Sequence, residues 1–317
     1  MDGVLIVDKP AGWTSHDVVA RVRRLLGVRR VGHTGTLDPF ATGVLVILPG
    51  RATRLAQFLA GAEKEYEAVI RLGRATDTGD LTGTPLPGAA QTGGTECAAW
   101  DDAEIEAALR SLRGPQEQVP PMYSAKKVGG RKLYELARRG EQVERAPISV
   151  NISLFEAVGR GGELLRRNED GTSDMSARVV CSAGTYVRTL AESFGARLGT
   201  GAHLAALRRT RAGEFRIEDA TGLDRLQEMA EAGTAEQLLL TPDAALSGMP
   251  FVHLTSDEAR RARHGAAVPV RRRAAPQWPD GEYVRIRDEH GKLLAVGVYR
   301  AAPGHLRPRV LLVSDEE

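Results

Sequence analysis

Cysteine is almost absent from this 317-residue sequence, which contains only Cys97 and Cys181. The two lie far apart and neither belongs to a CxxC motif, so the sequence predicts neither a disulfide framework nor a cysteine-ligated zinc site. The seven histidines show no HxxxH or comparable spacing, which leaves a metal ion without an obvious set of ligands. We therefore expect no resident metal, and we expect Cys181, in the segment ARVVCSAG, to be a small core residue.

Long apolar runs and nucleotide-binding motifs are also missing. No stretch is long and apolar enough to span a bilayer, and the first residues, MDGVLIVDKPAGW, lack the basic and apolar regions of a secretory signal. No Walker loop occurs, and no GxGxxG motif follows a predicted strand, so a nucleotide cofactor has no visible binding loop. These absences predict a soluble, cytoplasmic protein without a membrane partner and without a nucleotide cofactor.

A strong net charge is absent as well, because 43 Lys and Arg against 41 Asp and Glu give a formal net charge of +2. The basic residues are nevertheless unevenly distributed. Between residues 126 and 145, seven basic residues stand against three glutamates, and further basic clusters occupy residues 21–30, 208–216 and 260–273. Each cluster alone is more typical of a solvated surface, but the four together make a polyanion-binding surface an equally good interpretation.

The hydrophobic content of 42% predicts a well-packed globule, and 317 residues suit a large core with a smaller appended domain. Apolar residues with helical spacing between Ser15 and Gly27 predict a capped helix. A second such stripe between Gly184 and Gly199 predicts a helix that carries Arg188 in its first turn, off the apolar stripe. The other elements we expect are strands at residues 44–48 and 64–72, helices at 52–59, 101–112 and 133–139, and a β-rich domain after a boundary near residues 247–250.

One acidic residue stands out in the segment VGHTGTLDPFATGVLVILPG. Asp38 lies between a turn with Gly32 and Gly35 and the predicted strand at residues 44–48. Pro39 favours extended geometry at the residue before it, so Asp38 should lie at the mouth of a buried element. An aspartate before proline is most often a turn residue that binds its own backbone. A catalytic carboxylate is the alternative, and this segment alone does not separate the two.

Five segments resemble, in the same order, the motifs of one known family. They are KPAGWTSHDVV, GHTGTLDPFATGVL, KEYEAVIRLG with ATDTGDLTG, PPMYSAKKVGGRKLYELARRG, and CSAGTYVRTLAESFG with AHLAALRRT. By these motifs the sequence resembles the bacterial TruB family of tRNA pseudouridine-55 synthases. The resemblance covers most of residues 3–216 and is weakest at residues 86–99 and 159–176.

The resemblance implies a fold class and a reaction. The implied fold is α+β: a pseudouridine synthase domain of residues 1–248, with a mixed, largely antiparallel sheet and a basic thumb insertion at about 119–147, precedes a small β-rich, PUA-like RNA-binding domain of residues 249–317. The implied reaction isomerises uridine 55 in the T-loop of tRNA: the N1–C1′ bond breaks, the uracil rotates, and C5 bonds to C1′. This reaction needs no cofactor. The expected partner is the tRNA T-arm, and the expected state is a monomer.

The resemblance also assigns roles to individual residues. Asp38 corresponds to the catalytic aspartate, which could attack the sugar, attack the ring or remove a sugar proton. Cleavage of a glycosidic bond calls for an ionised carboxylate, and because burial raises the pKa of a carboxyl group, a cation is required nearby. Arg188 corresponds to the arginine that pairs with this acid, and its planar fork suits a carboxylate.

The remaining assignments concern the substrate. Tyr66 is by default a core aromatic on the buried face of its strand, but in the family this ring stacks on the extruded uracil, and its hydroxyl is a candidate acceptor of the C5 proton. His33 corresponds to the histidine that holds the flipped loop. Further substrate-binding candidates are Lys64, Asp77, Tyr186 and Leu207, together with Lys126, Arg131 and Lys132 of the thumb. For each of the first four, a packing or structural role is an equally good interpretation.

Two alternatives to a tRNA-modifying enzyme remain. One is a non-catalytic RNA-binding protein that helps tRNA to fold. The other is a synthase of the same fold that acts on another RNA or is guided by a partner complex. The intact motifs around Asp38, Tyr66 and Arg188 argue against a purely binding role, and the compact bacterial motifs favour stand-alone action.

Overall fold

The computed structural model describes residues 1–87, 100–124, 126–137, 139–141, 143–159, 162–270 and 278–313. Cys97 and residues 271–273 of the fourth basic cluster lie outside the described residues, as do Arg138 and the side chain of Lys132.

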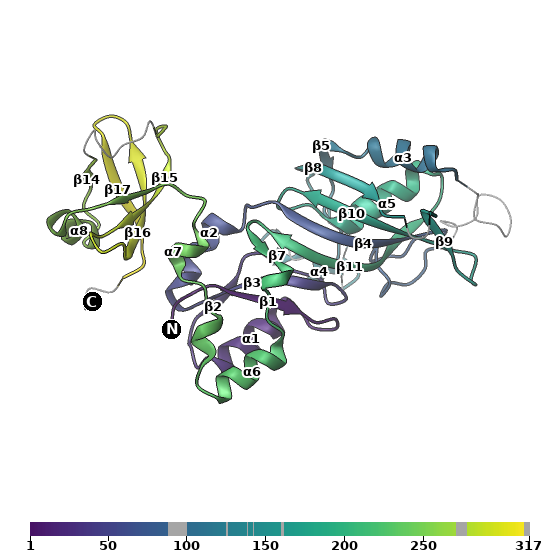
Figure 1. Ribbon diagram of the computed structural model, residues 1–317. Helices are drawn as coiled ribbons and strands as arrows, with labels where there is room; N and C mark the ends of the chain where they lie inside the picture. Colours follow the sequence, from purple (N-terminus) through teal and green to yellow (C-terminus); the bar gives the residue numbers. More distant parts are fainter. Residues whose placement is uncertain are drawn as a thin grey trace.

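One large sheet forms the centre of the first 216 residues (Figure 1). Its main strands follow the order β1 (Leu5–Lys9), β3 (Thr42–Pro49), β11 (Ala202–Ala212), β4 (Lys64–Leu72), β10 (Ser173–Cys181), β8 (Ile148–Ala157) and β5 (Gly114–Gln118). Three short strands extend it: β2 (Val31–His33) pairs with β3, β9 (Leu165–Arg167) with β10, and β12 (Phe215–Arg216) with β11. Of these pairings only that between β3 and β11 is parallel. The expected mixed, largely antiparallel sheet is confirmed.

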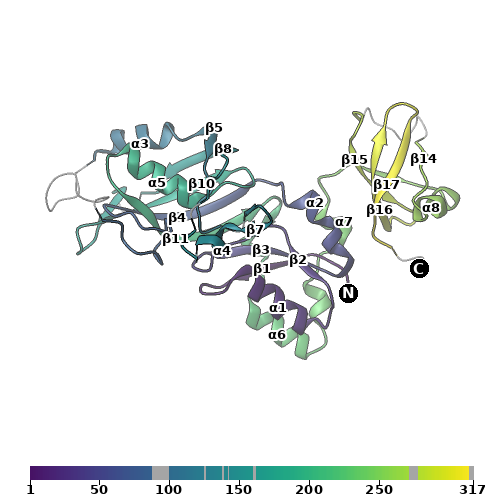
Figure 2. The ribbon, with the colours of Figure 1, turned by 180° about the vertical axis from the view of Figure 1, so that it is seen from behind.

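Helices cover the two halves of this sheet separately, as Figures 1 and 2 show. α1 (Ser15–Leu25) and α6 (Leu223–Glu231) pack on β1 and β3, while α3 (Asp102–Arg110) and α5 (Val187–Arg197) pack on β4, β8 and β10. Two short helices, η1 (Gly50–Leu55) and α2 (Ala56–Leu59), connect β3 to β4 and confirm the helical segment expected there. Three further short helices follow β12: η2 (Ile217–Asp219), η3 (Ala235–Leu238) and α7 (Pro242–Ala245).

The ends of α1 differ in one respect from the sequence expectation. Thr14, and not Ser15, is the N-cap, and it forms a capping box with Asp17. Ser15 is the first helical residue and is buried, so its hydroxyl is free to bind the backbone of Leu37. Gly27 follows the helix with a φ of 63°, a left-handed conformation that glycine adopts without strain, so the expected glycine stop is confirmed.

Alternation along β4 decides which side chains reach the interior. Lys64, Tyr66, Ala68, Ile70 and Leu72 are buried, whereas the residues between them are partly or fully exposed. This period of two is the pattern of a strand with one covered face, and it confirms that Tyr66 points inward.

The basic thumb consists of a two-stranded hairpin, β6 (Lys127–Val128) and β7 (Arg131–Lys132), followed by α4 (Leu133–Ala137). The helix expected here is confirmed, and its Leu133 and Leu136 are buried. The backbone N–H of Tyr134 donates to the carbonyl of Ser124 at 3.0 Å, which ties the thumb helix to the segment that precedes the hairpin.

A second sheet forms the C-terminal part, as expected from the alternating pattern. Its strand order is β13 (Phe251–His253), β15 (Tyr283–Arg287), β16 (Leu293–Arg300), β17 (His305–Leu311) and β14 (Val268–Pro269), and α8 (Ser256–Arg263) packs on it. Leu293 and Val296 of this sheet share an apolar cluster with Leu55 of η1. We propose that the domain boundary lies at 248/249, because α7 ends at Ala245 and β13 begins at Phe251.

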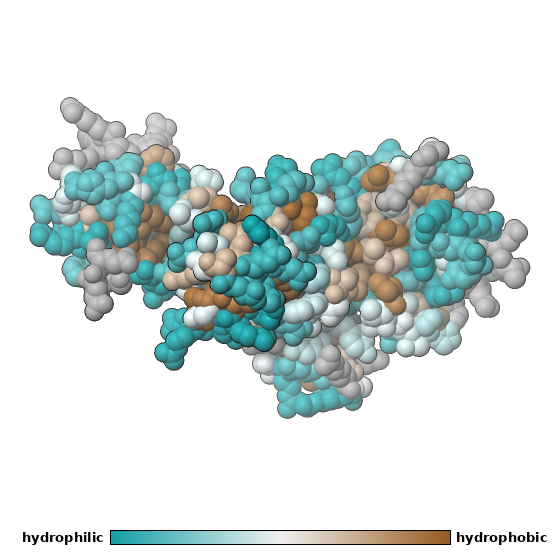
Figure 3. Space-filling model, turned by 60° about the horizontal axis from the view of Figure 1, so that its bottom comes forward, coloured by the Kyte–Doolittle hydropathy of each residue, from teal (hydrophilic) through white to brown (hydrophobic). Residues whose placement is uncertain are grey.

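Figure 3 shows one face of the molecule, on which hydrophilic residues predominate and hydrophobic residues gather in several separate groups. No helix in the described part of the chain combines the length and the apolar character that crossing a bilayer requires.

Candidate active site

The loop that carries Asp38 is held by hydrogen bonds at Gly35, Leu37 and Pro39. The Arg209 guanidinium donates to the carbonyl of Gly35 at 3.0 Å. The Ser15 hydroxyl accepts from the Leu37 N–H at 2.9 Å and donates to its carbonyl at 3.2 Å. The Pro39 carbonyl accepts from Lys9 Nζ at 3.2 Å. These contacts come from α1, β1 and β11, so the loop is fixed by one helix and by the two strands that flank β3.

Lys9 is an unusual member of this set, because it is a lysine with no exposed surface. Its ammonium group also donates to the carbonyls of Pro10 at 2.9 Å and Trp13 at 2.7 Å, so all three hydrogens have acceptors. Burial is the main cause that lowers the pKa of Lys9 to about 8, partly offset by the negative charge of Asp38.

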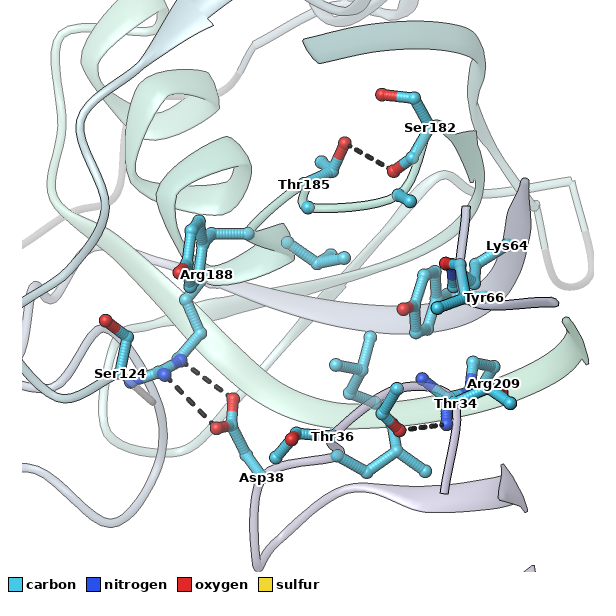
Figure 4. Close-up of a pocket in the computed structure, with 18 of the residues that line it drawn as sticks. Thr34, Thr36, Asp38, Lys64, Tyr66, Ser124, Ser182, Thr185, Arg188 and Arg209 are labelled. Atoms are coloured by element: carbon cyan, nitrogen blue, oxygen red, sulfur yellow. Dashed lines mark hydrogen bonds and ion pairs between the residues drawn. The ribbon is translucent and has the colours of Figure 1, made fainter. Parts of the chain in front are cut away.

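Asp38 and Arg188 form a two-pronged ion pair (Figure 4). Nε of Arg188 lies 2.9 Å from Oδ2 of Asp38, and Nη2 lies 3.2 Å from Oδ1. The arginine side chain is only 5% exposed, whereas that of Asp38 remains 32% exposed. Arg188 lies in the first turn of α5, as expected, but its side chain is buried in the pocket wall rather than solvated. The required cation is therefore present beside the acid.

Backbone carbonyls satisfy the other donors of Arg188. Nη1 donates to the Thr78 carbonyl at 2.9 Å, and Nη2 donates to the Tyr123 carbonyl at 2.7 Å. Burial raises the pKa of Asp38, and the charge of Arg188 opposes this without cancelling it. Because about a third of the Asp38 side chain remains exposed and lines the pocket, solvent and substrate have access to it.

A third charged residue, Asp80, contacts the arginine of this ion pair, and the sequence analysis did not single it out. Oδ2 of Asp80 lies 3.6 Å from Nη1 of Arg188. Its Oδ1 accepts from the Thr78 hydroxyl at 2.9 Å, and from the backbone N–H and hydroxyl of Thr82 at 2.9 and 2.6 Å. Asp80 is buried, while Asp77 of the same loop is exposed and accepts from the Thr84 N–H at 2.8 Å.

Tyr66 forms another wall of the same pocket. Its side chain is 7% exposed, and its partner across the sheet is Arg209 of β11. Burial raises the pKa of Tyr66, against an opposing effect of Arg209. Lys64, two residues earlier on β4, donates from Nζ to the carbonyls of Ala60 and Ala62 at 2.7 and 2.6 Å, and burial lowers its pKa to about 8.

The pocket has a volume of about 280 Å³. Asp38, Tyr66, Arg188, Lys64, Tyr186, Leu207 and Lys126 of the expected site residues line it. Three others do not: His33, Asp77 and Arg131 lie outside the lining, and Arg131 is exposed on β7. Lys132 lies beside it on the same strand.

His33 lies at the end of β2, next to the loop that carries Asp38. Its Nδ1 accepts from the Gly35 N–H at 3.3 Å, so the proton of the neutral ring is on Nε2. The ring meets that of His16 edge-on, with centroids 5.8 Å apart. Burial, together with the charges of His16 and Arg209, lowers the pKa of His33, so this ring is neutral at pH 7.

Within the described residues, no group of three or more His, Cys, Asp or Glu side chains is arranged to hold a metal ion. Cys181 is buried, and burial raises the pKa of its thiol to about 11, so it is a core residue rather than a nucleophile. The chemistry available in the pocket is therefore that of one carboxylate, the hydroxyls of two tyrosines and several buried cations.

Three family models match the chain. "TruB family pseudouridylate synthase (N terminal domain)" covers residues 23–187, "tRNA pseudouridylate synthase B C-terminal domain" covers 188–247, and "Pseudouridine synthase II TruB, C-terminal" covers 250–312. Curated relatives named tRNA pseudouridine synthase B agree. The protein from Geobacillus thermodenitrificans is 44% identical, over 97% of this chain and 98% of its own length, and that from Thermobifida fusca is 47% identical, over 90% and 94%.

Solved structures show the same fold. A Cbf5-Nop10-Gar1 complex contains a chain that matches with a TM-score of 0.68 and 28% identity, over 94% of this chain and 78% of that one. A chain of the archaeal box H/ACA sRNP Nop10-Cbf5 complex matches with a TM-score of 0.69 and 25% identity, over 98% and 86%. The pocket geometry, the family models and the relatives agree, and the chain belongs to the TruB family of pseudouridine synthases.

Proposed function

We propose that this protein converts uridine 55 in the T-loop of tRNA to pseudouridine, acting alone as a monomer. The relatives named tRNA pseudouridine synthase B support tRNA as the substrate. The observation that carries the chemical part of the proposal is the ion pair between Asp38 and Arg188 at the mouth of a pocket walled by Tyr66. This ion pair supports the proposal, because a nucleotide that enters the pocket would meet the carboxylate of Asp38.

Asp38 acts on the nucleotide in this proposal. The N1–C1′ bond breaks and its electron pair leaves with the uracil, and a carboxylate at the sugar or at the ring makes that cleavage possible. Arg188 keeps the carboxylate oriented and favours its ionised form, because an adjacent guanidinium stabilises negative charge. The ion pair is compatible with attack on the sugar, with attack on the ring and with removal of a sugar proton.

Tyr66 and the neighbouring lining residues hold the base. A uridine inside a folded loop must flip out of its stack, which costs a few kcal/mol and is offset by stacking on an aromatic ring. Tyr66 supplies that ring, and Leu207, Tyr186 and Lys64 complete the wall. The detached uracil rotates against this wall, C5 bonds to C1′, and the Tyr66 hydroxyl receives the proton that leaves C5.

The rest of the T-arm binds outside the pocket in our proposal. His33, next to the Asp38 loop, supports the flipped loop, and Arg131 and Lys132 on β7 contact phosphates. Lys126 connects the two regions, because it lines the pocket and its carbonyl accepts from the N–H of Leu133 in the thumb helix at 2.8 Å. The C-terminal β-rich domain adds a second RNA contact surface, in the manner of a PUA domain.

A tritium-release assay tests the function. T-arm minihelix RNA carrying [5-³H]uridine at the target position is incubated with wild-type protein and with the Asp38→Asn variant. We expect release with the wild type, none with Asp38→Asn, and similar RNA affinity for both. Binding by both proteins without release by either would favour the RNA-folding helper or a different RNA substrate. Release by Asp38→Asn would remove the catalytic role of Asp38.

A further inference from the structure

Arg209 is a buried cation that touches several parts of the site. It lies in the motif segment AHLAALRRT, but the sequence analysis gave it no role. It is 2% exposed and lines the pocket. In the pairing of β11 with β4 it lies directly opposite Tyr66, and opposed residues of an antiparallel pair project to the same face with their Cβ atoms about 4.5–5.5 Å apart. Figure 4 shows its guanidinium between the Tyr66 hydroxyl and the loop next to Thr34.

Two nitrogens of this guanidinium bind the backbone near Asp38. Nε donates to the carbonyl of Val44 at 2.6 Å, and Nη2 donates to that of Gly35 at 3.0 Å. The Tyr66 hydroxyl lies next to the same guanidinium (Figure 4), and the charge of Arg209 works against the effect of burial on the pKa of the phenol. A guanidinium can only donate, so in a hydrogen bond between the two the phenol oxygen is the acceptor and its own proton points away from Arg209.

We propose that Arg209 is a positioning residue for the isomerisation: it binds the Gly35 and Val44 carbonyls and the Tyr66 hydroxyl together, and so sets the phenol oxygen for removal of the uracil C5 proton. This inference rests on the proposed function. Lysine cannot replace Arg209, because one ammonium nitrogen does not present the planar fork that reaches three acceptors in fixed directions.

Every proton that moves when the uracil C5–H bond breaks can be accounted for. After C5 has bonded to C1′, the C5–H bond breaks and its electron pair returns to the ring, where N1 takes a proton from water. The C5 proton goes to the Tyr66 oxygen while the hydroxyl's own proton passes to water, so the phenol is neutral before and after the step, in keeping with its raised pKa. Arg209 stays charged throughout, and the label exchanges from the hydroxyl to solvent when the product leaves.

Arg209→Lys tests the role, with a readout that a purely structural residue would not change. The single-turnover rate and the deuterium isotope effect are measured with RNA carrying [5-²H]uridine at the target position. We expect a rate loss of about 10- to 100-fold, at the lower end of what positioned acid–base groups contribute, with RNA affinity unchanged. The isotope effect should increase, because C5 proton removal becomes slower than glycosidic cleavage.

Arg71→Lys is the matched control. Arg71 also lies on the large sheet and also makes a two-pronged contact, with Asp174 at 2.7 and 2.9 Å, but it does not line the pocket. Its replacement should leave the rate and the isotope effect unchanged. In a Tyr66→Phe background, Arg209→Lys should cause little further loss of rate, because the shared hydroxyl is already gone.

The outcomes separate the two proposals. Wild-type protein that fails to release the C5 hydrogen contradicts the proposed function itself. Wild-type turnover with an unchanged or smaller isotope effect in Arg209→Lys overturns only the role of Arg209, which would then merely hold the Asp38 loop. If Arg209→Lys does not fold, the ¹⁵N resonances of Arg209 are compared in wild-type and Tyr66→Phe proteins. A shift at Nη1 supports the contact with the hydroxyl, and no shift overturns it.

Discussion

Asp80 forms an ion pair with Arg188 at 3.6 Å, on the same guanidinium that holds Asp38. Three hydrogen bonds from Thr78 and Thr82 fix one oxygen of Asp80 and leave the other for Arg188. A buried arginine with two carboxylate partners has a more restricted orientation than one with a single partner, because each contact removes rotational freedom from the side chain. We therefore expect Asp80 to act on the proposed reaction through Arg188.

Asp80→Asn should slow the reaction while leaving RNA binding intact. The amide keeps the size of the side chain but removes the charge that orients Arg188, and a loss of about 1.4 kcal/mol of transition-state stabilisation corresponds to roughly tenfold in rate. Single-turnover tritium release measures this. Asp170→Asn is the control, because Asp170 forms an exposed ion pair with Arg74 at 3.3 Å and does not line the pocket. Equal rates for Asp80→Asn and wild type would contradict the positioning role.

The raised pKa of Asp38 predicts how the activity depends on pH. The reaction requires the ionised carboxylate, so activity falls as pH falls through the pKa of the folded enzyme. Since burial raises this pKa above the ordinary value of 3.8, the acidic limb of the profile of kcat/KM should have its midpoint above pH 3.8. Rates from about pH 3.5 to 7 measure it, with circular dichroism to confirm folding at each pH. A midpoint at or below 3.8 would show that Arg188 outweighs burial.

Lys9 gives a stability prediction at alkaline pH. Its pKa is lowered from 10.5 to about 8 in the folded protein, so between these values the unfolded chain binds more protons than the folded one. Unfolding free energy therefore rises with pH across this window. Relative to Lys9→Met, wild-type protein should gain stability from about pH 8 to 10.5, which urea titrations at several pH values measure. A constant difference between the two proteins across the window would contradict the lowered pKa.

A substitution at Gly43 tests how closely β3 approaches β11. Its φ is 100°, and a Cβ at this position would collide with the carbonyl oxygen of Arg209. Gly43→Ala should cost more than about 3 kcal/mol of unfolding free energy, because backbone strain of about 1–3 kcal/mol adds to overpacking of similar size. Gly265→Ala is the control for strain alone, since its φ is 75° and nothing lies within 4 Å of the added atom. Urea unfolding that gives equal losses for the two would refute the close approach.

The thumb prediction concerns RNA affinity. Replacing Arg131 and Lys132 of β7 by glutamate should weaken T-arm binding and reduce the slope of log affinity against log salt by about one for each phosphate that the protein no longer neutralises. Filter binding at several salt concentrations measures both quantities. Unchanged affinity and slope would remove these two residues from the RNA-binding surface.

Hydrophobic periodicity and turn residues predicted β3 and β4 of the large sheet and the helices that begin near residues 15, 102, 133 and 187. The other main strands, β1, β5, β8, β10 and β11, were expected only through the resemblance to a family with a mixed sheet. The alternation in residues 64–72 indicated the buried face of β4, and the stripe between Gly184 and Gly199 located α5 and placed Arg188 in its first turn. The cap of α1 was assigned to Ser15 although Thr14 performs it, because both residue types cap helices and adjacent candidates are separated only by backbone geometry.

The supporting residues of the site were harder to find. The loop ATDTGDLTG contains Asp77 and Asp80, and only the way this loop packs on α5 decides which acid faces Arg188. Arg208 and Arg209 are adjacent and project to opposite faces of β11, so the register with β4 was needed to see that Arg209 opposes Tyr66. The motif resemblance indicated the residues expected to contact substrate, but not the buried side chains that hold them.

β3 pairs with β11, a strand that lies far along the chain. This separation in sequence determines when the site can form during synthesis. Asp38 and Arg188 are separated by 150 residues along the chain, and Arg209 of β11 follows both. At about 5–20 residues per second, roughly 8–30 s pass on the ribosome between the appearance of the two members of the ion pair. Until β11 has been synthesised, the Asp38 loop lacks the hydrogen bond from Arg209 to Gly35. Until α5 has been synthesised, Asp38 lacks its ion pair with Arg188. The nascent chain can therefore complete the surroundings of Asp38 only after Arg209 has been synthesised.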